Sequence, residues 1–194
     1  MIRRIARALG VFALALTLAL ASAWWMIFHT PRSLAITNGP WRMSAVTGSM
    51  DADLYTRAIV AVTGLFALNR SETIYFSAEQ SDTHQRLLAR CSYAIEGKSL
   101  NARWWSVTAY ADDNFLIPNP AQRFSYDMGN LKAGFGGSFR ITAAPTEQPG
   151  YWLPTGSGNG GFSLLLRLYN PSPELLANPG KVALPSITQI GSCS

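Results

Sequence analysis

A long apolar run close to the N-terminus constrains this chain more than any other feature of its sequence. The residues from Ala8 to Phe28, ALGVFALALTLALASAWWMIF, carry no charge. As a helix, a run of this length can cross the hydrocarbon core of a bilayer, which is roughly 30 Å thick. The sequence therefore predicts an N-terminal transmembrane segment over residues 1–30.

The residues that flank this run indicate which of its ends lies in the cytoplasm. Trp24 and Trp25 lie near its C-terminal end, and aromatic side chains anchor helices at membrane interfaces. Basic residues favour the cytoplasmic side, and those that precede the run are Arg3, Arg4 and Arg7. We expect a single-pass protein of the inner (cytoplasmic) membrane whose globular domain lies in the periplasm.

The same segment also has features of a cleaved signal peptide. Ala21, Ser22 and Ala23 resemble the small-residue cleavage pattern that follows an apolar region. Apolar residues continue beyond them as far as Phe28, which favours retention as an anchor. Cleavage after Ala23 and retention both export the domain, so either interpretation predicts the same compartment.

The rest of the chain has the composition of one folded domain. Apolar residues make up 48% and aromatic residues 11% of the 194 residues, which is atypical of a disordered protein. We expect a linker over 31–48 and a single domain over 49–194. Without the three N-terminal arginines, 13 basic residues remain against 11 acidic ones. This balance, without basic clusters, argues against nucleic acid as a partner.

Hydrophobic periodicity predicts mainly β structure in this domain. In the clearest stretch, 162–169, Leu164, Leu166 and Leu168 face one way and Arg167 faces the other. Shorter alternating stretches recur along the chain, separated by Gly- and Pro-rich turns. A helical stripe over 51–69 predicts one helix that covers a sheet. The predicted fold is an antiparallel β-sandwich of jelly-roll type with one covering helix.

Two cysteines, Cys91 and Cys193, lie in the part of the chain that we expect to be exported. An even number of cysteines in an oxidising compartment favours a disulfide, which here would fix the C-terminus. The alternative is a pair of free thiols.

Several kinds of chemistry lack the residues that they need. His29 and His84 are the two histidines, and the cysteines do not have zinc-ligand spacing. The glycine-rich stretch 156–161 lacks the G-K-[ST] ending of a phosphate-binding loop and leads into a strand pattern. We therefore expect neither a metal nor a cofactor.

A set of polar and aromatic residues forms the candidate ligand-binding site. Aromatic rings cover apolar faces of sugars or amphiphiles, and polar groups fix the orientation of the ligand. The candidate residues are Arg103, Trp104, Asp112, Asn119, Arg123, Trp152, Arg167 and Tyr169. The alternative is that these aromatic residues belong to the core.

Three segments of the chain resemble one known family. They are ARWWSVTAYADDNFLIPNPAQRFSYD, QPGYWLPTGSGNGGFSLLLRLYNPSPELL and ALPSITQIGSC, and the short helix followed by ETIYF is also similar. These residues resemble the bacterial proteins that carry domain of unknown function 1214, over roughly Asp51 to Cys193. The resemblance implies a jelly-roll β-sandwich in an envelope protein, and the two cysteines look like those of short, single-domain relatives. It implies no reaction.

The sequence leaves three functions open. The first is a non-catalytic, membrane-tethered domain that binds a glycan, a lipid or a protein partner of the envelope. The second is a hydrolase or lyase acting on envelope or imported polymers through carboxylates such as Asp112, Asp113 or Asp127. The third is a structural subunit of an envelope complex that meets its partner through Trp104 and Trp105.

Overall fold

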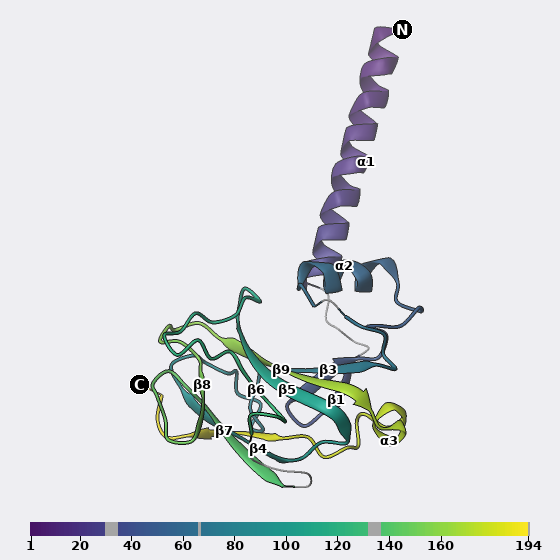
Figure 1. The fold of residues 1–194 in the computed structure, drawn as a ribbon. Coiled ribbons are helices and arrows are strands. Elements are labelled where there is room, and N and C mark those ends of the chain that lie inside the picture. Colours follow the sequence, from purple (N-terminus) through teal and green to yellow (C-terminus); the bar gives the residue numbers. More distant parts are fainter. Residues whose placement is uncertain (30–34, 66, 132–136, 194) are drawn as a thin grey trace.

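The computed structural model describes residues 1–29, 35–65, 67–131 and 137–193. It consists of two packed β-sheets and a long helix that extends away from them (Figure 1). The predicted mainly β fold and the long apolar N-terminal helix are confirmed. The jelly-roll topology stays a prediction.

The larger sheet has six strands, in the order β1-β2-β3-β9-β5-β6, and every neighbouring pair is antiparallel. Its long central strands are β9 and β5, which pair over most of their length. The strands are β1 (Ala35–Asn38), β2 (Trp41–Ser44), β3 (Thr73–Ala78), β9 (Phe162–Pro171), β5 (Ala102–Ala111) and β6 (Ser125–Asp127).

The smaller sheet has four strands, in the order β10-β4-β7-β8. They are β10 (Ser186–Ile190), β4 (Ser92–Lys98), β7 (Ser138–Ala144) and β8 (Tyr151–Pro154). The β7–β8 pair is parallel, whereas the sequence predicts an antiparallel sandwich. Because β8 is only four residues long, the short connection over 145–150 is long enough to bring the chain back beside Ile141, where the pairing with Tyr151 begins.

The core lies between the two sheets. Leu164, Leu166 and Leu168 are fully buried, as their alternation predicts. The ring of Trp105 in the larger sheet packs against Phe139 in the smaller one, with centroids 4.7 Å apart. Burying a side chain of this kind contributes roughly 1.5–3 kcal/mol. This packing fixes the register of β9 and β5, so the residues between the core positions point to the opposite side of the sheet.

A disulfide joins Cys91, which is buried, to Cys193 near the C-terminus. The two residues are 102 positions apart in the sequence. The bond holds the end of the chain against the sandwich, as expected from the paired cysteines.

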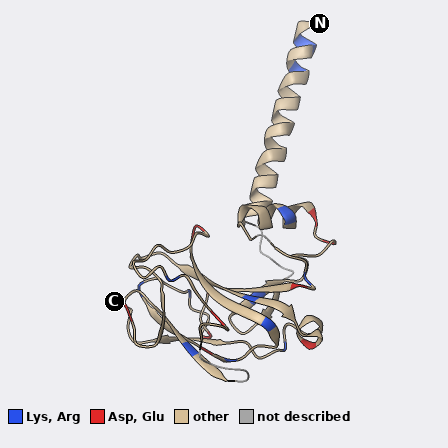
Figure 2. Cartoon of the chain, viewed as in Figure 1, with Lys and Arg blue, Asp and Glu red and all other residues tan. Residues whose placement is uncertain are grey.

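Helix α1 (Ile2–His29) carries the predicted membrane segment. None of its residues is buried against the rest of the protein, and it is long and apolar enough to cross a membrane. Figure 2 shows its basic residues at the N-terminal end. At the other end the ring of Trp25 stacks on His29, with centroids 4.4 Å apart. These features fit a membrane anchor.

Helix α2 (Leu54–Val62) differs from the helix that the sequence predicts over 51–69. Asp53 caps its start, because the backbone N–H of Thr56 donates to the Asp53 carboxylate at 2.9 Å. This hydrogen bond lowers the pKa of Asp53. No residue of α2 is buried, and α2 contacts α1, so the helix does not cover a sheet. A hydrophobic stripe shows that one face is apolar but not what that face meets.

A further short helix, α3 (Pro173–Ala177), follows β9, and Ser172 caps it by accepting from the backbone N–H of Leu175.

Part of the expected linker pairs with the larger sheet. β1 and β2 form a hairpin, and β2 pairs with β3 where Arg42 is opposite Ser77. Trp41 is fully buried and its Nε1 donates to the Pro185 carbonyl at 2.6 Å. Residues 30–34, where the anchor is expected to meet the linker, lie outside the described residues. The domain boundaries at 30 and 48 stay predictions.

Candidate functional site

The side of the six-stranded sheet that points away from the core is the candidate site, and we call it the outer face. It is formed by alternate residues of β3, β9 and β5. Tyr75 and Ser106 are the register partners of Arg167 on its two sides, and Trp104 is opposite Tyr169. Three of the eight predicted residues, Trp104, Arg167 and Tyr169, therefore share this face.

Arg167 lies half-buried at the centre of the outer face. Its Nη1 donates to Thr108 Oγ1 at 3.0 Å and its Nη2 donates to Tyr110 Oη at 2.7 Å. Its guanidinium carbon also lies 5.6 Å from the centroid of the Tyr110 ring. Both acceptors are neutral hydroxyl groups from β5, so they orient the guanidinium without neutralising its charge.

No described carboxylate forms an ion pair with Arg167. The ion pairs among the described residues are Arg86–Asp112 and Arg140–Glu96. Asp127, on β6 at the edge of the same sheet, has another role. Its carboxylate accepts from the backbone N–H groups of Gly129 and Asn130 at 2.7 and 3.0 Å. A guanidinium has five N–H donors, so Arg167 keeps donors for an anionic ligand.

Aromatic side chains flank this cation. The rings of Trp104 and Tyr169 meet edge to face with centroids 5.1 Å apart. Trp104 is 37% exposed, whereas its neighbour Trp105 is 1% exposed and belongs to the core. One of the two adjacent tryptophans is thus available to a ligand.

Tyr75 is a residue of the outer face that the sequence set does not include. Its Oη accepts from the backbone N–H of Leu68 at 3.0 Å, which ties the segment after α2 to this face. Alternation with buried Ile74 and Phe76 places Tyr75 outward. Only the pairing of β3 with β9, which is not local in sequence, places it beside Arg167.

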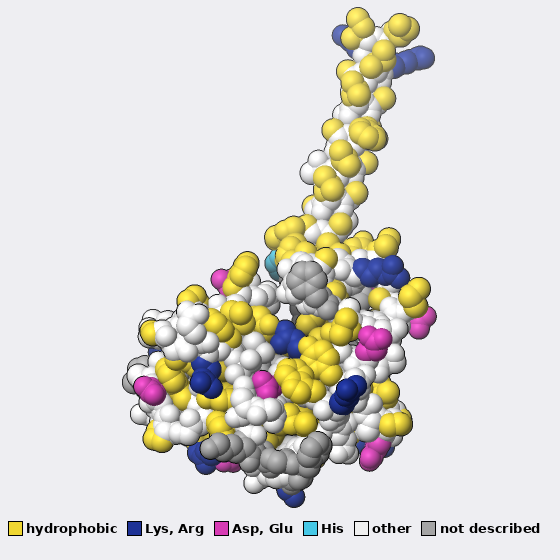
Figure 3. All heavy atoms as spheres, in the orientation of Figure 1, with side chains coloured by type: hydrophobic (Ala, Val, Ile, Leu, Met, Phe, Trp, Pro, Cys, Tyr) yellow, Lys and Arg dark blue, Asp and Glu magenta, His cyan; other side chains and the backbone are white. Residues whose placement is uncertain are grey.

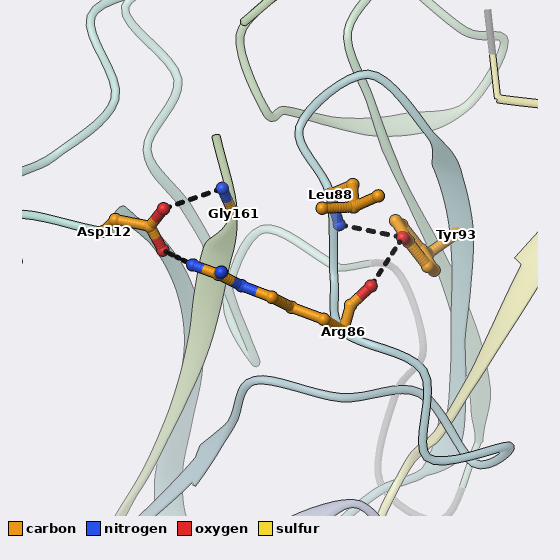
Figure 4. Close-up of polar contacts among 5 residues, drawn as sticks. All are labelled: Arg86, Leu88, Tyr93, Asp112 and Gly161. Atoms are coloured by element: carbon orange, nitrogen blue, oxygen red, sulfur yellow. Dashed lines mark hydrogen bonds and ion pairs between the residues drawn. The ribbon is translucent and has the colours of Figure 1, made fainter. Parts of the chain in front are cut away.

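Asp112 has a structural position away from the outer face. It accepts from Arg86 Nη2 and from the backbone N–H of Gly161, both at 2.8 Å, as Figure 4 shows. In the same region Tyr93 Oη accepts from the backbone N–H of Leu88. Asp112 thus joins the turn after β5 to the start of β9 and to the segment around Arg86.

The other predicted residues are also dispersed. Asn119 closes a loop: its Nδ2 donates to the Arg123 carbonyl and its Oδ1 accepts from the Arg123 N–H. Trp152 lies on β8 in the other sheet, and its Nε1 donates to the Ala144 carbonyl at 3.0 Å. Arg103 is exposed and alternates with Trp104, so it lies on the other side of β5.

Two wide, shallow depressions on the surface of the described residues lie away from Arg167. One, of about 500 Å³, is lined by the loop from Leu116 to Phe124 and includes Asn119. The other, of about 360 Å³, lies beside β7 and β8. No carboxylate lines either of them. On the outer face, Ser106 and Thr108 are buried beside the half-buried Arg167, so a ligand would lie across the strands.

The carboxylates considered for catalysis each hold a turn. Asp113 accepts from the backbone N–H of Phe115 at 3.0 Å, and Asp112 and Asp127 make the contacts given above. Among the described residues, no group of three or more His, Cys, Asp or Glu side chains could hold a metal ion.

Comparisons with known proteins place this domain among uncharacterised ones. The family described as Protein of unknown function (DUF1214) matches residues 72–173, which include β3, β5 and β9. The crystal structure of the VPA0106 protein from Vibrio parahaemolyticus is similar, with 24% sequence identity and a TM-score of 0.58. That match covers 73% of this chain and 36% of the other chain, so this chain spans about a third of its length. It shows a shared fold.

A crystal structure of an uncharacterised protein from Burkholderia cenocepacia is also similar. Its identity is 19% and its TM-score 0.42, over 61% of this chain and 29% of the other. No curated protein matches the chain.

Proposed function

We propose that the outer face determines the function of this chain, which belongs to the DUF1214 family of proteins of unknown function. The chain is a membrane-tethered envelope protein whose domain binds an anionic ligand at Arg167. The ligand carries a phosphate or carboxylate group beside a sugar ring or an apolar chain, as in an acidic glycan or a lipid headgroup.

The tether is α1. Its 28 residues correspond to about 42 Å of helix at 1.5 Å per residue, which is more than the roughly 30 Å of a hydrocarbon core. The arginines at its start and the tryptophans near its end support an inner-membrane anchor with a cytoplasmic N-terminus. The disulfide between Cys91 and Cys193 supports a domain in the oxidising periplasm.

The unneutralised charge of Arg167 is the observation that carries the proposed binding site. Arg is a planar fork of donors that matches carboxylate and phosphate groups. A hydrogen bond to a charged group contributes about 1.5–3 kcal/mol. Because Thr108 and Tyr110 already orient the guanidinium, ligand binding would cost little conformational entropy at this side chain.

The rings of Trp104 and Tyr169 favour a ligand with an apolar face next to its anionic group. Aromatic rings combine a large contact area with little loss of conformational freedom. Tyr169 lies on β9, the strand that carries Arg167, and Trp104 lies on the neighbouring strand β5, so the rings and the guanidinium could contact both parts of one ligand.

The test is a thermal-unfolding screen of the full chain in lipid nanodiscs. The probes are phosphorylated and uronic-acid oligosaccharides, peptidoglycan fragments and short-chain anionic lipids, each with a neutral counterpart. A ligand that binds only the folded state raises the unfolding midpoint, by an amount equivalent to about 2.7 kcal/mol at a hundred times the dissociation constant. We expect a shift with an anionic probe that its neutral counterpart does not give.

Arg167→Ala should abolish this shift, and Arg103→Ala is the charge-matched control that should keep it. Saccharide and lipid probes distinguish the two sources of the anionic group. Equal shifts with neutral probes, or the same shift in Arg167→Ala, would overturn the proposed site. Absence of any shift would favour the structural subunit, with Trp104 as a protein contact.

A further inference from the structure

Helix α2 carries an apolar stripe that the described residues cover only in part. At 100° per residue, the stripe consists of Leu54, Ala58, Ala61 and Val62, of which Ala58 is half-buried. The exposed fraction is 82% for Leu54 and 56% for Val62. Tyr55, at the margin of the stripe, is 43% exposed. A contiguous apolar strip of this kind on a short helix indicates an interaction surface.

The stripe lies near the C-terminal end of α1, the proposed membrane anchor. α2 contacts α1, and Figure 1 shows it lying across the C-terminal end of α1, between α1 and the six-stranded sheet. Figure 3 shows hydrophobic side chains along the side of α2 that is turned toward α1. Trp24 and Trp25, at the same end of α1, are 55% and 61% exposed. Both helices thus expose apolar side chains at one level.

Hydrogen bonds join the segments that precede and follow α2, and this holds the helix in place. The backbone N–H of Arg70 donates to the Gly48 carbonyl at 3.0 Å, and Arg70 Nη1 donates to the Ala45 carbonyl. Gly48 has a φ of +76°, and a Cβ atom there would meet the Leu68 carbonyl oxygen at 2.4 Å. The residues before and after α2 therefore meet between β2 and β3.

The side of α2 opposite the stripe carries two threonines together with Ile59 and Val60. Thr56 and Thr63 lie about 180° around the helix from Leu54, and both are partly covered, unlike Leu54 and Val62. Ile59 and Val60, which flank the two threonines, are half-buried as well. The helix thus turns a mixed side toward the protein and leaves Leu54 and Val62 of its apolar stripe exposed.

We propose that α2 is an interfacial membrane helix whose apolar stripe enters the outer leaflet of the bilayer that α1 crosses. This inference rests on the proposed anchoring by α1. Interfacial helices lie in the membrane plane with the apolar face about 5–10 Å into the boundary between headgroups and acyl chains. The orientation of α2 across the end of α1 gives this arrangement.

The charges of the helix and its cap decide which lipids it needs. Asp51, Asp53 and Arg57 sum to a charge of −1, so anionic lipids do not attract this segment. Insertion should depend on the apolar area and be the same in zwitterionic and anionic bilayers, and at low and high salt. This separates α2 from basic interfacial helices, whose binding falls as salt is added.

An interfacial α2 also orients the candidate site. The segment after α2 is bonded to Tyr75 on the outer face through the Leu68 N–H. The six-stranded sheet is the layer nearer to α1 and α2 (Figure 1). With α2 on the bilayer, the outer face would be turned toward the membrane surface.

The experiment places an environment-sensitive fluorophore (NBD) at single introduced cysteines of the disulfide-bonded full chain in phosphatidylcholine liposomes. Leu54→Cys probes the stripe, Thr56→Cys probes the opposite side of the same helix, and Leu14→Cys probes the middle of α1. We expect a blue-shifted emission at position 54 that spin-labelled lipids quench at least twofold more than at position 56. The quenching should not change with the protein-to-lipid ratio.

Water-like emission at position 54, with strong quenching at position 14, would overturn the interfacial helix and leave the anchor in place. Water-like emission at both positions would overturn the anchor as well. A blue shift at position 54 that disappears when the protein is diluted into lipid would assign the stripe to a second copy of the chain and overturn the proposal. Val62→Cys repeats the test at a second position.

Discussion

Arg167 on β9 donates a 2.7 Å hydrogen bond to the hydroxyl group of Tyr110 on the neighbouring strand β5. The bond joins two side chains on the outer face, because Ser163, the register partner of Tyr110, alternates with the buried leucines of β9. It holds a cation in a fixed direction on a surface that no described carboxylate neutralises. The proposed anion site depends on this contact and on the second bond, to Thr108.

Tyr110→Phe should weaken ligand binding and leave the fold intact. The substitution removes one of two acceptors that orient the guanidinium, and a net hydrogen bond contributes about 0.5–1.5 kcal/mol. We expect the affinity for the anionic ligand to fall about threefold to tenfold. The measurement is a titration of the full chain with the ligand in detergent. Tyr55→Phe on α2 is the control that should bind as the wild type does. Unchanged binding by Tyr110→Phe would show that the guanidinium needs no such orientation.

Replacement of the two adjacent tryptophans should separate core packing from binding. Trp105→Ala removes a side chain that is 1% exposed, and truncating a buried Trp costs about 3–5 kcal/mol. Trp104→Ala should lower the free energy of unfolding by only about 1 kcal/mol, mainly through the lost contact with Tyr169. Urea unfolding of the full chain in mild detergent measures both. Equal losses would contradict the different roles assigned to the two rings.

The disulfide should be a large contribution to stability. Cys193→Ser opens a loop whose ends are 102 residues apart, and in the chain-entropy model such a loop is worth about 4.7 kcal/mol. Cys193 is exposed, so the substitution itself removes little packing. Urea unfolding with and without a reductant gives the difference, and a reductant should have no further effect on the variant. Labelling of both thiols in the native protein would contradict the bond.

Asp112→Asn tests whether this carboxylate has more than a structural role. The side chains of Arg86 and Asp112 are 63% and 51% exposed, so solvent screens the ion pair and its loss should cost less than about 1 kcal/mol. Ligand binding at Arg167 should not change. The measurement is the thermal midpoint with and without ligand. Loss of ligand binding in this variant, with the fold intact, would return Asp112 to the binding site.

The sequence predicts the outward direction of Arg167 because strand alternation is a local property. Leu164, Leu166 and Leu168 identify one face within a single strand, and Arg167 must then lie on the other. Trp152 and Asn119 were expected in the same site, but their position depends on which strands are neighbours. That order arises from pairing between distant segments, which no local pattern contains.

The segment before residue 48 shows the same limit. Trp41 lies in a short, polar, glycine-punctuated stretch that predicts a linker, yet it is fully buried, with its Nε1 on the Pro185 carbonyl. The bond joins residues 144 positions apart. Likewise, the apolar stripe of α2 predicts a helix with one hydrophobic face, and only the tertiary structure shows that Leu54 and Val62 on this face are exposed.

The most direct test of the central claim is the dissociation constant of an anionic ligand from the nanodisc screen, measured by isothermal titration with the full chain. The variants are Arg167→Ala and Arg167→Lys, with Arg103→Ala as control. Our account predicts at least tenfold weaker binding by Arg167→Ala, equivalent to about 1.4 kcal/mol, and an intermediate value for Arg167→Lys, which keeps the charge but loses the planar fork. An unchanged dissociation constant in Arg167→Ala, or an equal loss in Arg103→Ala, would contradict a binding site centred on Arg167.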